Sequence, residues 1–102
     1  MTEISIIIPT LNESDNLPLL LADLSEIYRD AEILVIDANS KDMTKEISII
    51  YGAKYFLIRK RNRGLQLNYG ASKAKGNWLL FLHADSRLKR NWSHEILSLI
   101  HI

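Results

Sequence analysis

The chain has 102 residues and a formal net charge of +1, and 47% of its residues are hydrophobic, which is ordinary for a small globular domain. The balanced charge gives no basis for a nucleic-acid-binding surface, so we expect no nucleic acid among its partners. The sequence contains no cysteine, which excludes disulfides and thiolate metal sites and fits a cytoplasmic protein. Because no stretch approaches the roughly 20 apolar residues of a membrane span, we expect any membrane contact to be peripheral.

The first apolar run, Ile4 to Ile8, is typical of a buried strand and is followed by Pro9. Ser14 or Asp15 is suited to capping the helix that should come next. That helix is predicted from apolar residues at helical spacing, namely Leu17, Leu20, Leu21, Leu24 and Ile27.

The middle of the sequence predicts strand, helix and strand. Glu32 to Asp37 is a second buried strand, and a short helix follows from Thr44 to Tyr51. Gly52 is well placed as a left-handed residue that ends this helix. Lys54 to Ile58 is the third strand.

The last part of the sequence predicts helix, strand and helix. A helix from Gly64 to Lys75 ends at Gly76, and Trp78 to Leu82 is the fourth and most apolar strand. Asn91 to His101 is predicted to be a helix with Ile96, Leu97 and Ile100 on one face.

Alternation of apolar strands with helices predicts an α/β fold, a Rossmann-like parallel sheet with helices on both faces. No linker or repeat divides the sequence, so we expect one domain over residues 1–102. The last residues are apolar without a helix cap, and we therefore expect this domain to be truncated at its C-terminus.

Polar groups follow each predicted strand, at the edge where open parallel sheets bind ligands. Carboxylates and amides at this edge can accept hydrogen bonds from a base N–H and from ribose hydroxyls. Arginines can pair with phosphate oxygens, and a carboxylate can hold a divalent cation. Together these groups would hold a nucleoside diphosphate. The four segments are Pro9-Thr10-Leu11-Asn12-Glu13, Asp37-Ala38-Asn39-Ser40, Arg59 to Gly64, and His83-Ala84-Asp85.

Three segments in order resemble family-two glycosyltransferases, which have a GT-A fold. Ile4 to Glu13 looks like their opening strand, Leu34 to Thr44 like their second-strand motif, and Arg63 to Asp85 like their helix, strand and metal motif. The branch with His-Ala-Asp at the metal motif is the most similar. The resemblance covers essentially the whole chain, which would be the nucleotide-sugar-binding half of such an enzyme.

The resemblance implies a role for five residues. Thr10 and Glu13 would lie against the nucleoside, Glu13 toward the ribose, and Asp37 would accept from the base. Arg63 would face the base or the diphosphate, and Asp85 would coordinate Mn²⁺ or Mg²⁺ through the diphosphate. The implied function is metal-assisted transfer of a sugar from a UDP- or GDP-sugar to an acceptor that the sequence does not identify.

Some residues depart from the family pattern. His83 stands where the metal motif usually has a carboxylate, and Met43 where many members have glycine. The helix motif lacks its usual arginine in the stretch from Gln66 to Gly70, and Arg63 is one turn earlier. The catalytic base is expected in an acceptor-binding half that this sequence does not include, so no catalytic residue is assigned here.

Two other functions stay open at this point. The chain could be a non-catalytic module that binds a nucleotide or associates with itself through a sheet edge, which makes a homo-oligomer one expected outcome. An unrelated nucleotide-binding α/β domain is the other alternative. No G-x-G-x-x-G follows the first strand and no Walker lysine loop occurs, which speaks against its common forms.

Overall fold

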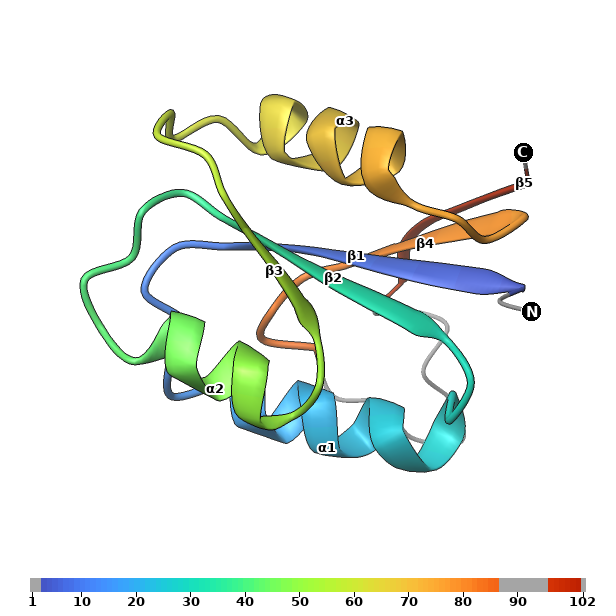
Figure 1. Ribbon diagram of the computed structural model, residues 1–102, viewed down its shortest axis with the longest axis horizontal. Coiled ribbons are helices and arrows are strands. Elements are labelled where there is room, and N and C mark those ends of the chain that lie inside the picture. The colour runs from blue at the N-terminus through green and yellow to red at the C-terminus, as the bar shows by residue number, and fades with distance from the viewer. Residues whose placement is uncertain (1–2, 87–95, 102) are drawn as a thin grey trace.

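The apolar run near the N-terminus forms the central strand of a twisted sheet (Figure 1). The computed structural model describes residues 3–86 and 96–101. Within these residues the elements are β1 (Ile4–Thr10), α1 (Leu17–Ile27), β2 (Glu32–Asp37), α2 (Thr44–Ile50), β3 (Lys54–Leu57), α3 (Arg63–Lys73), β4 (Trp78–Leu82) and β5 (Ile96–His101). None of the helices in these ranges is long and apolar enough to cross a membrane.

The strand order is β3-β2-β1-β4-β5, and β1 to β4 are parallel. The predicted Rossmann-like parallel sheet is therefore confirmed. The chain builds the sheet outward on one side of β1 and then returns to add β4 on the other side. The strand order thus reverses at β1, and in open α/β sheets ligands bind outside the carboxyl ends of the strands at such a point.

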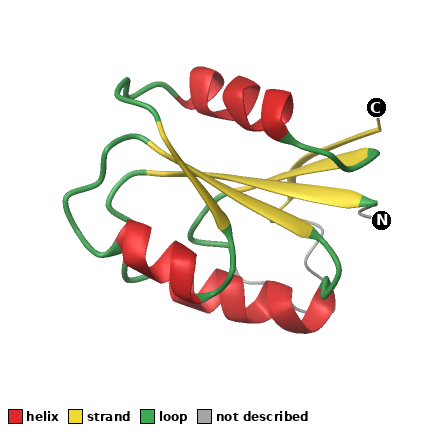
Figure 2. Cartoon of the chain, viewed as in Figure 1, coloured by secondary structure: helices red, strands yellow, loops and turns green. Residues whose placement is uncertain are grey.

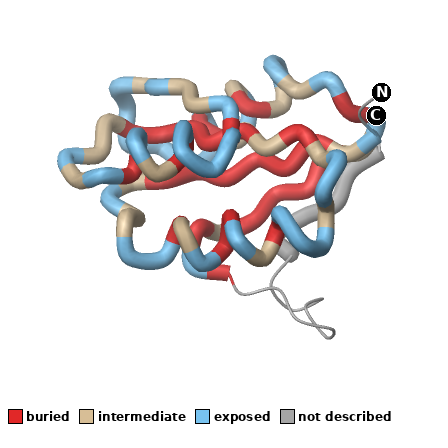
Figure 3. The backbone as a smooth tube through the Cα atoms, turned by 60° about the horizontal axis from the view of Figure 1, so that its bottom comes forward, coloured by how far each residue is buried: buried red, intermediate tan, exposed pale blue. Residues whose placement is uncertain are grey.

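Helices cover both faces of the sheet, as expected, with α3 on one face and α1 and α2 on the other (Figures 1 and 2). Side chains of β1 alternate between the two layers because successive residues of a strand point to opposite faces. Ile6 and Ile8 pack with the leucines of α1, whereas Ile7 packs in the cluster that includes Leu67 and Ala71 of α3. All three isoleucines are fully buried, and Figure 3 shows the strands as the buried centre of the molecule.

The prediction of a helix over Asn91–His101 is wrong for the residues of this range that the structure describes. Residues 96–101 form β5, which pairs antiparallel with β4, for example Leu80 with Leu99. Residues 91–95 lie outside the described residues. A six-residue apolar run satisfies strand and helix patterns about equally, and here the free hydrogen-bonding edge of β4 favours the strand.

Helix ends differ from prediction at α1 and agree at α2. The residue before α1 is Asn16, not Ser14 or Asp15, and its side chain makes no capping bond. The turn over residues 13–16 replaces that cap, since the carbonyl of Glu13 accepts from the N–H groups of Asn16 and Leu17. At the end of α2, Gly52 has φ +80°, which confirms the predicted left-handed residue.

Candidate functional site

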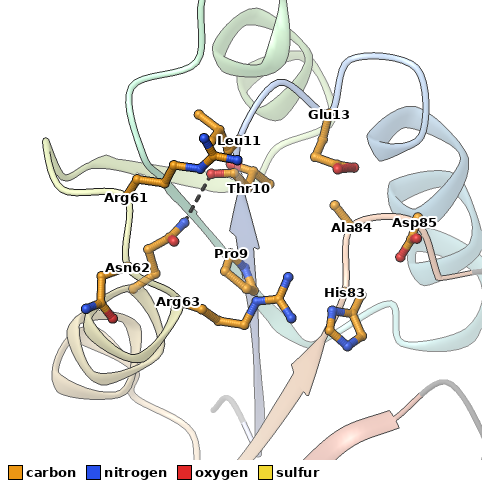
Figure 4. Close-up of a pocket in the computed structure, with 11 residues that line it drawn as sticks. Pro9, Thr10, Leu11, Glu13, Arg61, Asn62, Arg63, His83, Ala84 and Asp85 are labelled. Carbon is orange, nitrogen blue, oxygen red and sulfur yellow. Dashed lines mark hydrogen bonds between the residues drawn. The ribbon is translucent and has the colours of Figure 1, made fainter.

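A cleft of about 440 Å³ opens at the carboxyl ends of β1 and β4 (Figure 4). Its walls come from the β1–α1 loop, the segment that leads into α3, and the end of β4. The lining residues are Pro9, Thr10, Leu11, Glu13, Arg61, Asn62, Arg63, Gln66, His83, Ala84 and Asp85. This is the edge at which the sequence placed a ligand.

Pro9 accounts for the opening of the cleft between β1 and β4. The carbonyl of Thr10 accepts from Ala38 beside β2, so the backbone of the preceding residue, Pro9, faces β4. Proline has no N–H to donate, and the described β1–β4 pairs end at Ile7 and Phe81. The β1–β2 pairs continue to Thr10 and Asp37. Strand β1 therefore parts from β4 while it stays bound to β2, which leaves room at the sheet edge.

The β1–α1 and β2–α2 loops are joined by reciprocal hydrogen bonds. The Oγ of Ser40 accepts from the N–H of Asn12 at 2.7 Å, and the Oδ1 of Asn12 accepts from the N–H of Lys41 at 2.8 Å. Asn12 and Asn39 have positive φ angles, which asparagine tolerates better than most residues. One wall of the cleft is thereby held in a fixed shape.

Asp42 ties the same two loops together. Its Oδ2 accepts from the N–H of Ser14 at 3.0 Å, and its Oδ1 accepts from the N–H and hydroxyl of Thr44. Burial opposes ionisation, but the hydrogen bonds from Thr44 and Ser14 outweigh it and lower the pKa of Asp42 from 3.8 to about 2. These contacts give Asp42 a structural role in joining the two loops.

Replacing Asp42 by alanine is expected to lower the free energy of unfolding by about 1–2 kcal/mol, since three donors lose their acceptor. Because the folded pKa is depressed, this stability is fully present above pH 3.8 and is lost as the pH falls toward about 2. Urea unfolding at several pH values measures the difference between wild type and variant. The exposed Asp15→Ala serves as the control, and an equal effect of both variants would contradict the assigned role.

Asp37 lies outside the cleft, fully buried beneath the loop. Four groups donate to its carboxylate: the hydroxyls of Thr10 at 2.7 Å and Tyr55 at 2.6 Å, and both the N–H and the hydroxyl of Ser40. A carboxylate accepts about four hydrogen bonds. The contacts of Asp37 thus fix the end of β1, the β2–α2 loop and β3 relative to one another.

Glu13 is partly buried at the cleft, and its Oε2 is a buried atom without a hydrogen-bond partner among the described residues. Burial of the carboxyl and then the negative charge of Asp85 raise the pKa of Glu13 above its ordinary value of 4.5. An unpaired buried acceptor is costly, so this oxygen is suited to a donor that arrives with a ligand. A ribose hydroxyl is such a donor.

Opposite charges line opposite sides of the cleft. In Figure 4 the guanidinium groups of Arg61 and Arg63 lie on the α3 side, and the carboxylates of Glu13 and Asp85 lie on the other side. Arg61, Arg63 and Asp85 are exposed, so their side chains can reach a ligand without leaving a packed position. An anion with a cation bound to it could therefore contact both sides at once.

A divalent cation would find two carboxylates in the cleft, Asp85 and Glu13, and carboxylate oxygens are the ligands that Mg²⁺ takes. Over residues 3–86 and 96–101 no three His, Cys, Asp or Glu side chains are grouped so that they alone could hold a metal. The residues present fit a cation only if oxygens of a phosphate ligand or of water complete its coordination.

Residues 5–101 match the sequence profile of the family described as glycosyl transferase family 2. The chain belongs to glycosyl transferase family 2. A PGL/p-HBAD biosynthesis glycosyltransferase of Mycobacterium bovis is 37% identical over an alignment of 91 residues, and the match covers 82% of this chain. The match covers 36% of that relative, so the chain spans about a third of the length of the curated relatives it matches.

Solved structures share the fold of this family member. The S. aureus TarS 1–349 structure in complex with UDP has a TM-score of 0.77 and 25% identity, and the match covers 87% of this chain and 29% of that chain. Glucosyl-3-phosphoglycerate synthase from Mycobacterium tuberculosis, solved with Mn²⁺, UDP and glucosyl-3-phosphoglycerate, has a TM-score of 0.73 and 20% identity, with 84% of this chain and 36% of that chain covered. These structures establish the GT-A nucleotide-binding half as the fold of the chain.

The structure brings four of the five sequence-assigned site residues to one cleft, namely Thr10, Glu13, Arg63 and Asp85. Asp37 instead contacts the cleft residue Thr10 from below. Sequence reasoning gave no ligand role to Gln66, which is buried and lines the cleft. Gln66 and Gly70 are four residues apart, so both lie on the sheet-facing side of α3. This spacing was the feature of the sequence from which the position of Gln66 could have been predicted.

Proposed function

We propose that this member of glycosyl transferase family 2 binds a nucleotide-diphosphate sugar in the cleft and forms the donor site of a sugar transferase. The observation that carries the proposal is that two arginines, Arg61 and Arg63, and two carboxylates, Glu13 and Asp85, line one cleft at the switch point of the sheet. The UDP bound to TarS and to glucosyl-3-phosphoglycerate synthase supports the choice of ligand.

Each cleft residue has a distinct part in this proposal. Arg63 and Arg61 pair with phosphate oxygens, and Glu13 accepts from a ribose hydroxyl through its unpartnered Oε2. Thr10 forms the floor under the nucleoside, and Asp37 holds Thr10 in place through the 2.7 Å hydrogen bond between their side chains. Asp85 offers its exposed carboxylate to a metal bound to the diphosphate.

Sugar transfer leaves charge on the departing nucleoside diphosphate. A bound Mn²⁺ or Mg²⁺ would neutralise that charge, and Asp85 would be its ligand from this chain. Arg63 and Arg61 would stabilise the same charge from the other side, in a position set before the bond breaks. His83 fills the first place of the metal motif in the proposed His-Ala-Asp branch and lines the cleft beside Ala84 and Asp85.

The activity of the whole protein is part of the proposal, because the chain spans about a third of its curated relatives. The acceptor and the catalytic base are assigned to the region that the relatives have in addition. The single domain over residues 1–102 and the cytoplasmic location also stay predictions, the latter based on the absence of cysteine.

Calorimetric titration with UDP and GDP, each with Mn²⁺ and with EDTA, tests the donor site. We expect nucleotide binding that weakens at least tenfold in EDTA, and an Asp85→Ala variant whose affinity in Mn²⁺ falls to the EDTA level. The matched control is Asp15→Ala, an exposed aspartate outside the cleft. If nucleotide binding by Asp85→Ala still depends on metal as in the wild type, the proposed role of Asp85 as a metal ligand is contradicted.

Arg63→Gln is expected to weaken UDP binding about tenfold both with and without metal, since an arginine–phosphate pair does not need the cation. Arg59→Gln is the control, because Arg59 belongs to the same basic segment but does not line the cleft. Equal losses in both variants would mean that general charge, not the cleft, attracts the nucleotide. If the folded wild type binds neither UDP nor GDP, the chain is better explained as a non-catalytic module.

A further inference from the structure

Gln66 is a buried polar residue in the wall of the cleft, with 5% of its surface exposed. It lies in the second turn of α3, over the carboxyl ends of β1 and β2. Its Nε2 donates to the carbonyl oxygen of Thr10 at 3.1 Å, the dashed line in Figure 4, and to that of Ile36 at 2.8 Å. The amide thus spans the two strands that form the floor of the cleft.

These two contacts fix the orientation of the amide. A carbonyl oxygen only accepts hydrogen bonds, so the side-chain atom facing Thr10 and Ile36 must be the nitrogen. Both hydrogens of Nε2 are then used. The oxygen Oε1 is the remaining polar atom of Gln66, and it is an acceptor held on a packed side chain at the cleft.

Asp37, the residue that the family resemblance places against the base, has its acceptor positions already filled. Thr10, Ser40 and Tyr55 supply four donors to its carboxylate, and none of its surface is exposed. A base N–H could reach it only by replacing one of these donors, which would leave a buried polar group unpaired.

We propose that Gln66, and not Asp37, determines which nucleobase the cleft accepts, by receiving a hydrogen bond at Oε1 from a base N–H. This role of Gln66 rests on the donor site proposed above, and it makes Gln66 the residue that contacts and selects the base. Uracil carries an N3–H donor, whereas the N3 of cytosine is an acceptor that would face Oε1 with like polarity. A buried site that bonds one polar group discriminates strongly against an analogue that lacks it. The cleft should therefore prefer UDP over CDP.

The test compares the affinities of UDP, CDP and pyrophosphate in calorimetric titrations of wild type and Gln66→Met. We expect the wild type to bind UDP at least tenfold more tightly than CDP, and Gln66→Met to reduce this ratio to about one. Asn68→Met, an exposed position on the same helix outside the cleft, should leave the ratio unchanged. A loss of structure alone would weaken all three ligands together and would not move the ratio.

A second measurement needs no variant of Gln66. In the wild type, the side-chain amide resonances of Gln66 should shift when UDP is added and stay in place when pyrophosphate is added. The inference is overturned if wild type binds UDP and CDP equally, or if Gln66→Met keeps the wild-type ratio of the two affinities. If the folded wild type binds no UDP at all, the proposed donor site is contradicted, and the proposed role of Gln66 in base selection is contradicted with it.

Discussion

Replacing Glu32 by alanine is expected to lower the free energy of unfolding by about 3 kcal/mol. The carboxylate is buried at the start of β2, where its Oε1 accepts from the hydroxyl of Ser5 at 2.7 Å and from the N–H of Lys75 at 2.8 Å. Its Oε2 forms an ion pair with Lys54. Alanine leaves the buried hydroxyl of Ser5 and the N–H of Lys75 without this acceptor. Urea unfolding measures the loss, with the exposed Glu26→Ala on α1 as the control.

The effect of Glu32→Ala should depend on pH in one direction. Burial acts to raise the pKa of Glu32, but the hydrogen bonds from Lys54, Ser5 and Lys75 outweigh it and hold that pKa below 4.5. A depressed folded pKa means that the stabilisation is complete above pH 4.5 and disappears as the pH falls through the folded pKa. The difference in the free energy of unfolding between wild type and Glu32→Ala should therefore shrink as the pH is lowered. A gap that stays constant from neutral to acid pH would mean that the charged form of Glu32 is not what stabilises the fold.

Gly76→Ala is expected to cost a similar amount, about 3 kcal/mol, through steric overlap. The N–H of Gly76 donates to the Oγ of Ser5 at 2.8 Å, which draws the α3–β4 turn against β1. A Cβ on Gly76 would lie 2.7 Å from the backbone N of Ser5 and 2.9 Å from the carbonyl carbon of Ile4. These are backbone atoms of a central strand held by β2 and β4, so they cannot yield easily.

Gly64→Ala is the matched control for Gly76→Ala. Gly64 is exposed in the first turn of α3, and a Cβ there would meet only the side-chain Oδ1 of Asn62 at 3.3 Å. We expect a change within about 1 kcal/mol, and alanine favours the helix. Equal urea midpoints for wild type and Gly76→Ala would show that β1 can shift after all. Because Glu32 and Gly76 both contact Ser5, the double variant should lose less than the sum of the single losses.

The sequence was sufficient to predict the parallel part of the fold. Strands β1, β2 and β4 are buried on both faces, so each is a largely apolar run, and the helices between the strands have a clear period. The segment Ile96–His101 was misassigned because its partner, the edge of β4, is a property of the assembled sheet and not of the segment. Short apolar runs carry too little periodicity to settle such a choice.

The cleft was predictable because the carboxyl ends of parallel strands meet at one edge. The sequence could not show which polar groups at this edge are already hydrogen-bonded within the protein and which are open to a ligand. The donors around Asp37 come from Thr10, Ser40 and Tyr55, which are brought together only by three neighbouring strands and their loops. The same is true of Gln66, since its two acceptors are backbone carbonyls that no residue pattern distinguishes.

The place of β4 beside β1 has a consequence for the order in which the molecule assembles. Pairing Ile4 with Trp78 closes a loop that contains β2, β3 and the helices α1, α2 and α3, which is a large entropic cost before any contact is gained. We expect β4 to dock late, after β1, β2 and β3 have joined. Since residues at the end of β4 line the cleft, a nucleotide that binds there as proposed would recognise only the finished structure. It should then slow unfolding while leaving the refolding rate nearly unchanged.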